Sequence, residues 1–391
     1  MDPRHVLEAV TDDLVVEIAA ELLRFPSVLG EEGPAGLALA ERMRRLGYEV
    51  GLQEVVKGRY NVIGIVRGRG GGRNLLLNGH LDVPDPVPGW TGDPYGAEVR
   101  DGWLYGNGVT DMKGGLAAQV AAGAALLRSG VALGGDLVVT AVMHHDVQGV
   151  GTKFLVQALD PPCHMAINGE PTDLAVQLAH GGACQFELTV RGRPAHVSRR
   201  EEGVDAIRKM LDLLGRLDES RLTFRPDPRL PYLPRLVVGR IEGGRAPGVT
   251  AESCLVRGDV RLVEGMSPTT LLRDLERLIA EARRQDPALE AEARTLASQR
   301  PFAIDEDALI VRIVRDAHAT VTGRPAVVTT GLPAGCFVSD SPDLLRAGIP
   351  TVVYGPTEWR MVPDERARVA DLVAAARVYA LAALAVCGAA P

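Results

Sequence analysis

Apolar and polar residues follow one another along the first 178 residues in patterns that predict helices and short strands in turn. Apolar positions recur at helical spacing in 12–23, where Thr11 can cap the helix and Pro26 favours its end. Helices that alternate with short apolar strands are typical of an α/β domain, so we expect a mixed, mainly parallel sheet with helices on both faces. The expected elements are helix 12–23, helix 35–46, strand 60–66, strand 74–77, helix 113–128 and strand 136–143.

The pattern changes near residue 179. From there, a strand–helix–strand–strand–helix order predicts a compact α+β unit with an antiparallel sheet. Helix–strand alternation resumes after about residue 297, so we expect a discontinuous first domain, 1–178 and 297–391, around an inserted domain, 179–296. The expected elements are strand 185–191, helix 204–217, strand 235–241, strand 252–262 and helix 269–285, followed in helix–strand alternation by 309–321, 327–329, 344–347, 351–354 and 364–385.

Composition and charge narrow the classes of protein that this chain can belong to. Its 391 residues, 46% hydrophobic and 24% charged, suffice for two domains with sizeable cores. The net charge of −7 provides no basic field for nucleic acid or an anionic membrane. Five scattered cysteines without a CxxC pair argue against a disulfide scaffold or a thiolate zinc cluster. Because the N-terminus has no signal-peptide pattern and the apolar run 378–390 is too short for a bilayer, we expect a cytoplasmic protein.

Four segments with unusual polar residues each follow a predicted strand. His80 and Asp82 stand two apart, which on an extended segment places both side chains on one face, where Asp82 can orient the imidazole. Asp111 can bridge two metal ions or simply cap the next helix. Because ligand sites in such sheets lie beyond the carboxyl ends of strands, these segments together predict an oxygen and nitrogen site for a zinc-like metal. The candidate residues are His80, Asp82, Asp111, His144, His145, Asp146 and Glu170.

The order of the motifs resembles one family over nearly the whole chain. The motifs are GHLDVP, W-T-x-D-P-Y, DGWLYGNGVTDMKGG, GEPT, TVRGRPAHVS and GIPTVVYGP. They look like those of the zinc metallohydrolases that include acetylornithine deacetylase, succinyl-diaminopimelate desuccinylase, glutamate carboxypeptidase and aminoacylase. The resemblance implies an amidase with a two-zinc centre. It further implies that His80 and Glu170 hold one zinc, that Asp82 orients His80, and that Asp111 bridges the two ions.

The chain departs from this family at three positions of the expected centre. The family has two adjacent glutamates where His145 and Asp146 stand, so the resemblance implies His145 as the general base and Asp146 as a ligand. His145 can instead bind the metal itself. Met361 stands where the family has a ligand histidine, and a thioether is a poor ligand for a zinc-like ion. We therefore expect one ion rather than two, with zinc first and cobalt or manganese as alternatives.

Two residues of the inserted domain match functional positions of the family. His196, in RGRPAHVS, matches a histidine that crosses a dimer interface to stabilise the oxyanion of the attacked carbonyl. Arg261, in RGDVRL, matches a residue that binds a substrate carboxylate. The resemblance thus implies a homodimer formed through the inserted domain and a small substrate that carries a carboxylate. Cys336 lies in a loop that the family brings towards the site, and we interpret it as a small buried apolar residue.

Three hypotheses about function follow. The first is a metal-dependent amidohydrolase that cleaves a small N-acyl amino acid or dipeptide-like substrate at an altered, mononuclear centre. The second is an enzyme of the same fold with changed chemistry, in which His145 acts as an acid or base with weak or no dependence on metal. The third is a catalytically silent homologue that keeps the cleft for binding. The retention of His80, Asp82, Asp111 and Glu170 argues against full loss of the site.

Overall fold

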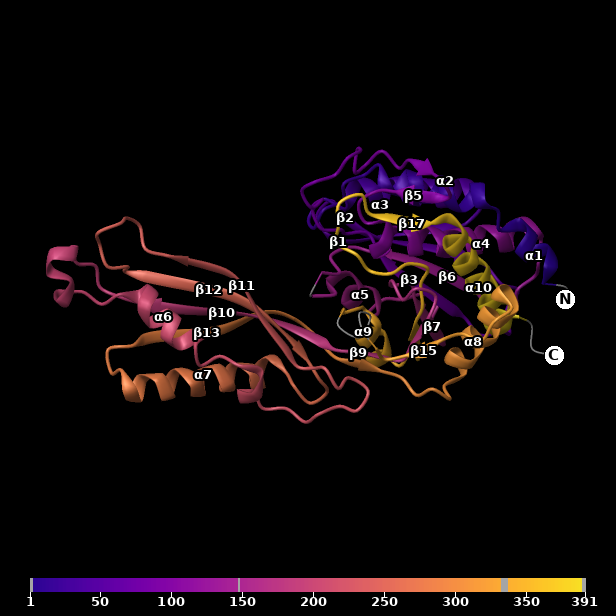
Figure 1. The fold of residues 1–391 in the computed structure, drawn as a ribbon. Helices are drawn as coiled ribbons and strands as arrows, with labels where there is room; N and C mark the ends of the chain where they lie inside the picture. The colour runs from indigo at the N-terminus through magenta and orange to yellow at the C-terminus, as the bar shows by residue number, and fades with distance from the viewer. Residues whose placement is uncertain (1–2, 147, 332–336, 389–391) are drawn as a thin grey trace. The chain divides into compact units, whose positions relative to one another are not determined.

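The structure is a computed structural model that describes residues 3–146, 148–331 and 337–388 (Figure 1). Contacts between residues divide it into two units. The smaller unit is His180–Phe302 together with Phe337 and Val338, and the other described residues form the larger unit. The smaller unit extends past the predicted boundary at 296 because a strand that ends at Gln299 belongs to its sheet.

The larger unit has a central sheet of eight strands in the order β1-β2-β6-β3-β7-β16-β8-β15. Strand β3 pairs in parallel with β6 and β7, and β16 pairs in parallel with β7. Strands β1, β2 and β6 are successively antiparallel, so the sheet is mixed with a parallel centre, as predicted. The bounds are β1 (Glu49–Val56), β2 (Arg59–Val66), β3 (Leu75–His80), β6 (Leu137–Val142), β7 (Met165–Asn168), β8 (Val176–Gln177), β15 (Val328–Thr329) and β16 (Thr351–Val353).

Helices cover both faces of this sheet because successive residues of its buried strands point to opposite sides. Leu75 and Leu77 of β3 join the main apolar core, whereas Leu76 joins a smaller core with Leu344. The main core contains side chains of α1, α2, α3, α4, α8 and α10, and Leu344 belongs to α9. The bounds are α1 (Arg4–Ala9), α2 (Asp12–Leu23), α3 (Gly33–Leu46), α4 (Gly114–Ser129), α5 (Val150–Leu155), α8 (Leu309–Thr322), α9 (Ser341–Arg346) and α10 (Val369–Cys387).

Helix α10 is the one described helix that is long and apolar enough to cross a membrane. Its apolar window is 61% buried within the structure, and the helix packs against α4, α8 and α2. A core helix passes the same test of length and composition. The remaining elements of the unit are short: η1 (Val109–Lys113), β4 (Val99–Arg100), β5 (Trp103–Tyr105) and β17 (Arg366–Arg368). Two further short strands, β9 (Ala179–His180) and β14 (Phe302–Ala303), lie where the chain passes from one unit to the other.

The smaller unit is an antiparallel sheet of four strands in the order β11-β12-β10-β13. Alternate residues of β10, from Cys184 to Val190, join side chains of α6 and α7 in one apolar core, so both helices lie on one face. The bounds are β10 (Gly182–Arg191), η2 (Val197–Glu202), α6 (Ala206–Leu214), η3 (Glu219–Arg221), β11 (Arg235–Gly243), β12 (Ser253–Leu262), α7 (Pro268–Gln285) and β13 (Glu290–Gln299).

A close backbone contact joins the start of α4 to the loop that follows β7. A Cβ atom added at Gly115 would lie 2.3 Å from the carbonyl oxygen of Gly169, which precedes Glu170. We predict that Gly115→Ala lowers the free energy of unfolding by about 1–3 kcal/mol, because backbone must move to admit the methyl group. Urea denaturation measures this change.

The control is Gly36→Ala in α3. There the nearest atom to an added Cβ is Cδ1 of Leu81, at 3.3 Å, which is the end of a flexible side chain. The helix gains from alanine roughly what the contact costs, so we expect a change below about 1 kcal/mol. Equal losses in the two variants would show that the Gly115 contact is not tight.

Candidate metal centre

Three side chains meet at one edge of the central sheet because their strands are neighbours. His80 is the last residue of β3, while His145 and Glu170 follow the ends of β6 and β7. The order β6-β3-β7 is parallel throughout, with His80 opposite Val142 and Asn78 opposite Asn168. The carboxyl ends of the three strands therefore lie side by side, where α/β sheets place their ligand sites.

His80, His145 and Glu170 form a buried cluster that can hold a metal ion. One ligand atom of each lies within 4.8 Å of those of the other two. The imidazole rings are stacked, with centroids 4.4 Å apart and planes inclined by 8°. Oε2 of Glu170 lies 3.7 Å from Nε2 of His80, and Oε1 lies 3.9 Å from Nε2 of His145. These separations are too long for hydrogen bonds, and Oε1 of Glu170 is buried without a hydrogen-bond partner among the described residues.

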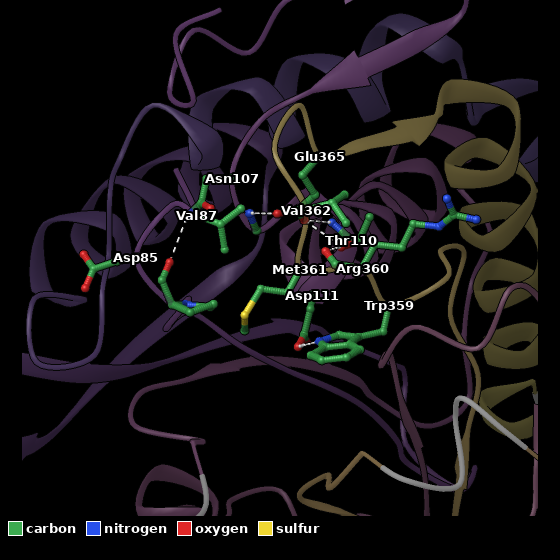
Figure 2. Close-up of a pocket in the computed structure, with 12 residues that line it drawn as sticks. Asp85, Val87, Asn107, Thr110, Asp111, Trp359, Arg360, Met361, Val362 and Glu365 are labelled. Atoms are coloured by element: carbon green, nitrogen blue, oxygen red, sulfur yellow. Dashed lines mark hydrogen bonds between the residues drawn. The ribbon is translucent and has the colours of Figure 1, made fainter. Parts of the chain in front are cut away.

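Asp111 lies beside this cluster, in the segment between β5 and α4. Its Oδ1 is 3.2 Å from Nε2 of His80, and its Oδ2 accepts a hydrogen bond of 2.8 Å from the indole nitrogen of Trp359 (Figure 2). Glu365 fixes the loop, since its carboxylate accepts backbone N–H groups of Gly108 and Thr110 at 3.0 and 2.7 Å. The segment around Trp359 therefore reaches the oxygen of Asp111 that does not face His80.

Asp82 acts differently from the prediction. Nδ1 of His80 lies 2.9 Å from the backbone carbonyl of Asp82, and not against its carboxylate. The carboxylate instead accepts the backbone N–H groups of His145 and Asp146, at 2.9 and 3.0 Å. Asp82 thus orients His80 through its main chain and fixes the loop after β6 through its side chain.

The structure brings His145 into the cluster and leaves Asp146 out of it. With both backbone N–H groups held by Asp82, the His145 side chain is buried and the Asp146 side chain is exposed. The cluster among the described residues contains His145, the alternative ligand, and not Asp146, so the role of Asp146 as a ligand stays a prediction. Met361 is 50% exposed and lines a solvent-open pocket together with Asp111 and Trp359 (Figure 2).

Asp340 is a member of the site that the sequence did not reveal. Its Oδ1 lies 3.1 Å from Nδ1 of His145, and its Oδ2 accepts a hydrogen bond of 2.8 Å from the hydroxyl of Thr152. In the sequence it looks like a helix cap before Ser341-Pro342, yet its side chain makes no capping hydrogen bond. A contact between residues 195 positions apart has no local signal.

The charges of the cluster shift the pKa values of its members. Burial lowers the pKa of His145, but the nearby carboxylates of Asp340 and Glu170 together raise it to about 9. Burial likewise lowers the pKa of His80, whereas Glu170 and Asp111 hold it well above its usual value. Burial raises the pKa of Glu170, despite the opposing effect of the two histidines. Without a cation, the two imidazoles therefore take up protons to balance the carboxylates.

The two predicted residues of the smaller unit occupy different settings. His196 is exposed, and its Nδ1 accepts the backbone N–H of Ser198 at 3.2 Å. The neutral ring then carries its proton on Nε2, which is the arrangement that an oxyanion donor needs. Arg261 is one-third exposed, with its Nε 2.9 Å from Oδ1 of Asp259. Cys336 lies outside the described residues.

The chain is similar in sequence to known proteins. The model of peptidase family M20/M25/M40 matches residues 76–385. An acetylornithine deacetylase of Myxococcus xanthus is 32% identical over 89% of this chain and 88% of its own length. A deformylase of N-formyl-4-amino-5-aminomethyl-2-methylpyrimidine from Halalkalibacterium halodurans is 27% identical over 84% of this chain and 83% of its own length.

A solved structure shows the same fold. The di-peptidase Dug1p of Saccharomyces cerevisiae superposes with a TM-score of 0.82, covering 97% of this chain and 98% of its own, at 13% sequence identity. The family match spans most of the chain and includes all members of the cluster. The protein belongs to peptidase family M20/M25/M40, a family of metal-dependent hydrolases that act on C–N amide bonds.

Proposed function

We propose that this protein hydrolyses the amide bond of a small N-acyl amino acid or dipeptide-like substrate, with one zinc ion held by His80, His145 and Glu170. The buried cluster of these three side chains is the observation that carries the proposal. Two imidazoles and one carboxylate are the ligand set of several catalytic zinc sites, which keep a further position open for water or substrate. The unpaired Oε1 of Glu170 fits this role, since a cation would satisfy it.

Several features support a single ion. The indole N–H of Trp359 already occupies Oδ2 of Asp111, the oxygen with which a bridging carboxylate would bind a second metal. Met361 supplies a thioether where the related enzymes have an imidazole, and the exposed Asp146 lies outside the cluster. Zinc suits the donor set best, and cobalt or manganese would also accept it.

Each remaining residue has a defined part in hydrolysis. When bound, the ion would polarise the amide carbonyl and lower the pKa of a bound water. Asp111, next to the cluster, is the carboxylate that we propose to accept the proton of the attacking water. His196 would donate a hydrogen bond from Nε2 to the oxyanion, and the guanidinium of Arg261 would bind a substrate carboxylate.

The names of the related enzymes support the class of substrate. One removes an acetyl group and another a formyl group from an amine nitrogen, so a small acyl group is the shared feature. We also propose that the protein is a homodimer joined through its smaller unit, as the proposed role of His196 implies. We further propose that it is cytoplasmic, as expected from its sequence.

A second candidate function rests on the raised pKa of His145. With a pKa of about 9 in the metal-free site, its imidazole is protonated at neutral pH and can act as an acid rather than a base. Such chemistry would persist after the removal of metal. Metal dependence therefore separates the two candidates.

We predict that metal-depleted protein recovers hydrolysis of N-acetyl amino acids on addition of one equivalent of zinc. Further zinc should add no activity, because Asp111 and Met361 do not complete a second site. Elemental analysis after gel filtration and a parallel assay of released amino acid measure the two quantities. Full activity in chelator-treated protein would favour the second candidate instead.

The variant Met361→His with Asp146→Glu serves as the control for stoichiometry. It restores the imidazole and the longer carboxylate of the related enzymes, so binding should rise towards two equivalents. A wild-type protein that binds two equivalents would contradict the mononuclear centre.

We predict that zinc affinity rises with pH between about 6 and 9. The pKa of His145 is about 9 and that of His80 is raised, so below those values zinc must displace protons from both rings. Each displaced proton strengthens the apparent affinity about tenfold per pH unit until the pKa is passed. Calorimetry in buffers of different ionisation enthalpy counts the released protons. An affinity that does not depend on pH would show that the rings are already neutral.

We predict that His196→Ala lowers kcat by about 10²–10³-fold with little change in KM, since an oxyanion donor acts mainly in the transition state. Steady-state kinetics with the preferred N-acyl substrate measure the split. His5→Ala, which removes another exposed histidine, is the matched control and should leave kcat unchanged. An unaltered kcat in His196→Ala would exclude this residue from catalysis.

A further inference from the structure

Behind the metal cluster lies a second buried layer, formed by Asp340 and Thr152. Asp340 directly precedes α9, Thr152 belongs to α5, and both side chains are almost fully buried. One carboxylate oxygen of Asp340 contacts Nδ1 of His145 at 3.1 Å, while the other accepts the Thr152 hydroxyl at 2.8 Å. Both oxygens thus have a partner, and the carboxylate is fixed from two sides.

We propose that Asp340 is a positioning residue that orients His145 as a metal ligand through Nε2. The proposal rests on the metal centre of the proposed function, and it deepens that function by naming what orients the ligand. This role differs from that of general base, which the resemblance to the family implies for His145.

The hydrogen bond decides which ring nitrogen is available. An ionised carboxylate accepts hydrogen bonds and donates none, so Nδ1 of His145 carries a proton. In the neutral ring, Nε2 then holds a lone pair. When a carboxylate accepts a hydrogen bond from the ring nitrogen that faces away from the metal, it fixes the ring and makes the metal-binding nitrogen more basic.

Nε2 of His145 faces a carboxylate oxygen of the cluster. Nε2 of His145 lies 3.9 Å from Oε1 of Glu170, an oxygen that no described residue satisfies. Two ligand atoms bound to one zinc at about 2.0–2.2 Å can be at most about 4.4 Å apart, so the separation fits a shared ion. It is too long for a hydrogen bond between the two groups.

The ring itself has little room to take another orientation. It is stacked on His80 with a centroid distance of 4.4 Å, and its backbone N–H is held by the Asp82 carboxylate. With the ring fixed on three sides, His145 presents Nε2 to the cluster.

The test measures zinc affinity by competition with a chromophoric chelator, so no activity is read. Asp340→Ala should weaken zinc binding about 10–100-fold, as losses of such outer partners do. The double variant His145→Ala with Asp340→Ala should bind no more weakly than His145→Ala alone, because Asp340 acts only through His145. Additive losses in the double variant, or an affinity in Asp340→Ala equal to that of the wild type, would overturn the proposal.

Two variants of Thr152 change the buried layer less than Asp340→Ala does, so they test the proposal even if Asp340→Ala fails to fold. Thr152→Val removes the hydroxyl at nearly constant volume and should weaken zinc binding measurably, whereas Thr152→Ser keeps the hydroxyl and should not. Equal affinities in this pair would count against a fixed carboxylate.

Nitrogen-15 NMR of the zinc-loaded wild-type protein needs no variant. It should show the His145 proton on Nδ1, and a proton on Nε2 would refute the assignment. Normal zinc binding with no amide hydrolysis would contradict the proposed function while leaving this proposal intact.

Discussion

The carboxylate of Asp82 is the contact on which the centre depends. It accepts two consecutive backbone N–H groups after β6, those of His145 and Asp146. Consecutive side chains on such a held segment diverge, so one is buried in the cluster and the other faces solvent. The backbone carbonyl of Asp82 also accepts a hydrogen bond from Nδ1 of His80. Asp82 therefore positions both imidazoles.

Much of the fold could be predicted because the buried strands and amphipathic helices carry strong periodicity. Helix α2 has the bounds that the apolar spacing indicated, and β3 and β6 were placed within a few residues, whereas the strand before Glu170 was expected without bounds. Strand β1 was missed because it is a half-exposed edge strand, and β13 because its alanines and glutamates favour helix. Pairing with neighbouring strands decides the structure of both.

The site could be predicted where its residues follow strands and not where they depend on tertiary contacts. His80 and Glu170 stand at strand ends, so their convergence followed from the parallel order of β3 and β7. The choice between His145 and Asp146 depends on a backbone contact from Asp82, which sequence spacing does not encode. Asp340 reaches the centre only through the packing of α9, and no pattern near it indicates a partner.

The charge of the centre links protonation of its rings to the binding of a cation. The carboxylates of Asp111, Glu170 and Asp340 lie close to the two imidazoles, and the buried carboxylate of Asp82 holds the backbone of the same loop. In the proposed centre, two protons on the rings would contribute a charge of +2, and one divalent ion on neutral rings would contribute the same +2. Exchange of the protons for one ion would therefore leave the charge of the site unchanged, and this is why protons and the ion would compete for the two rings.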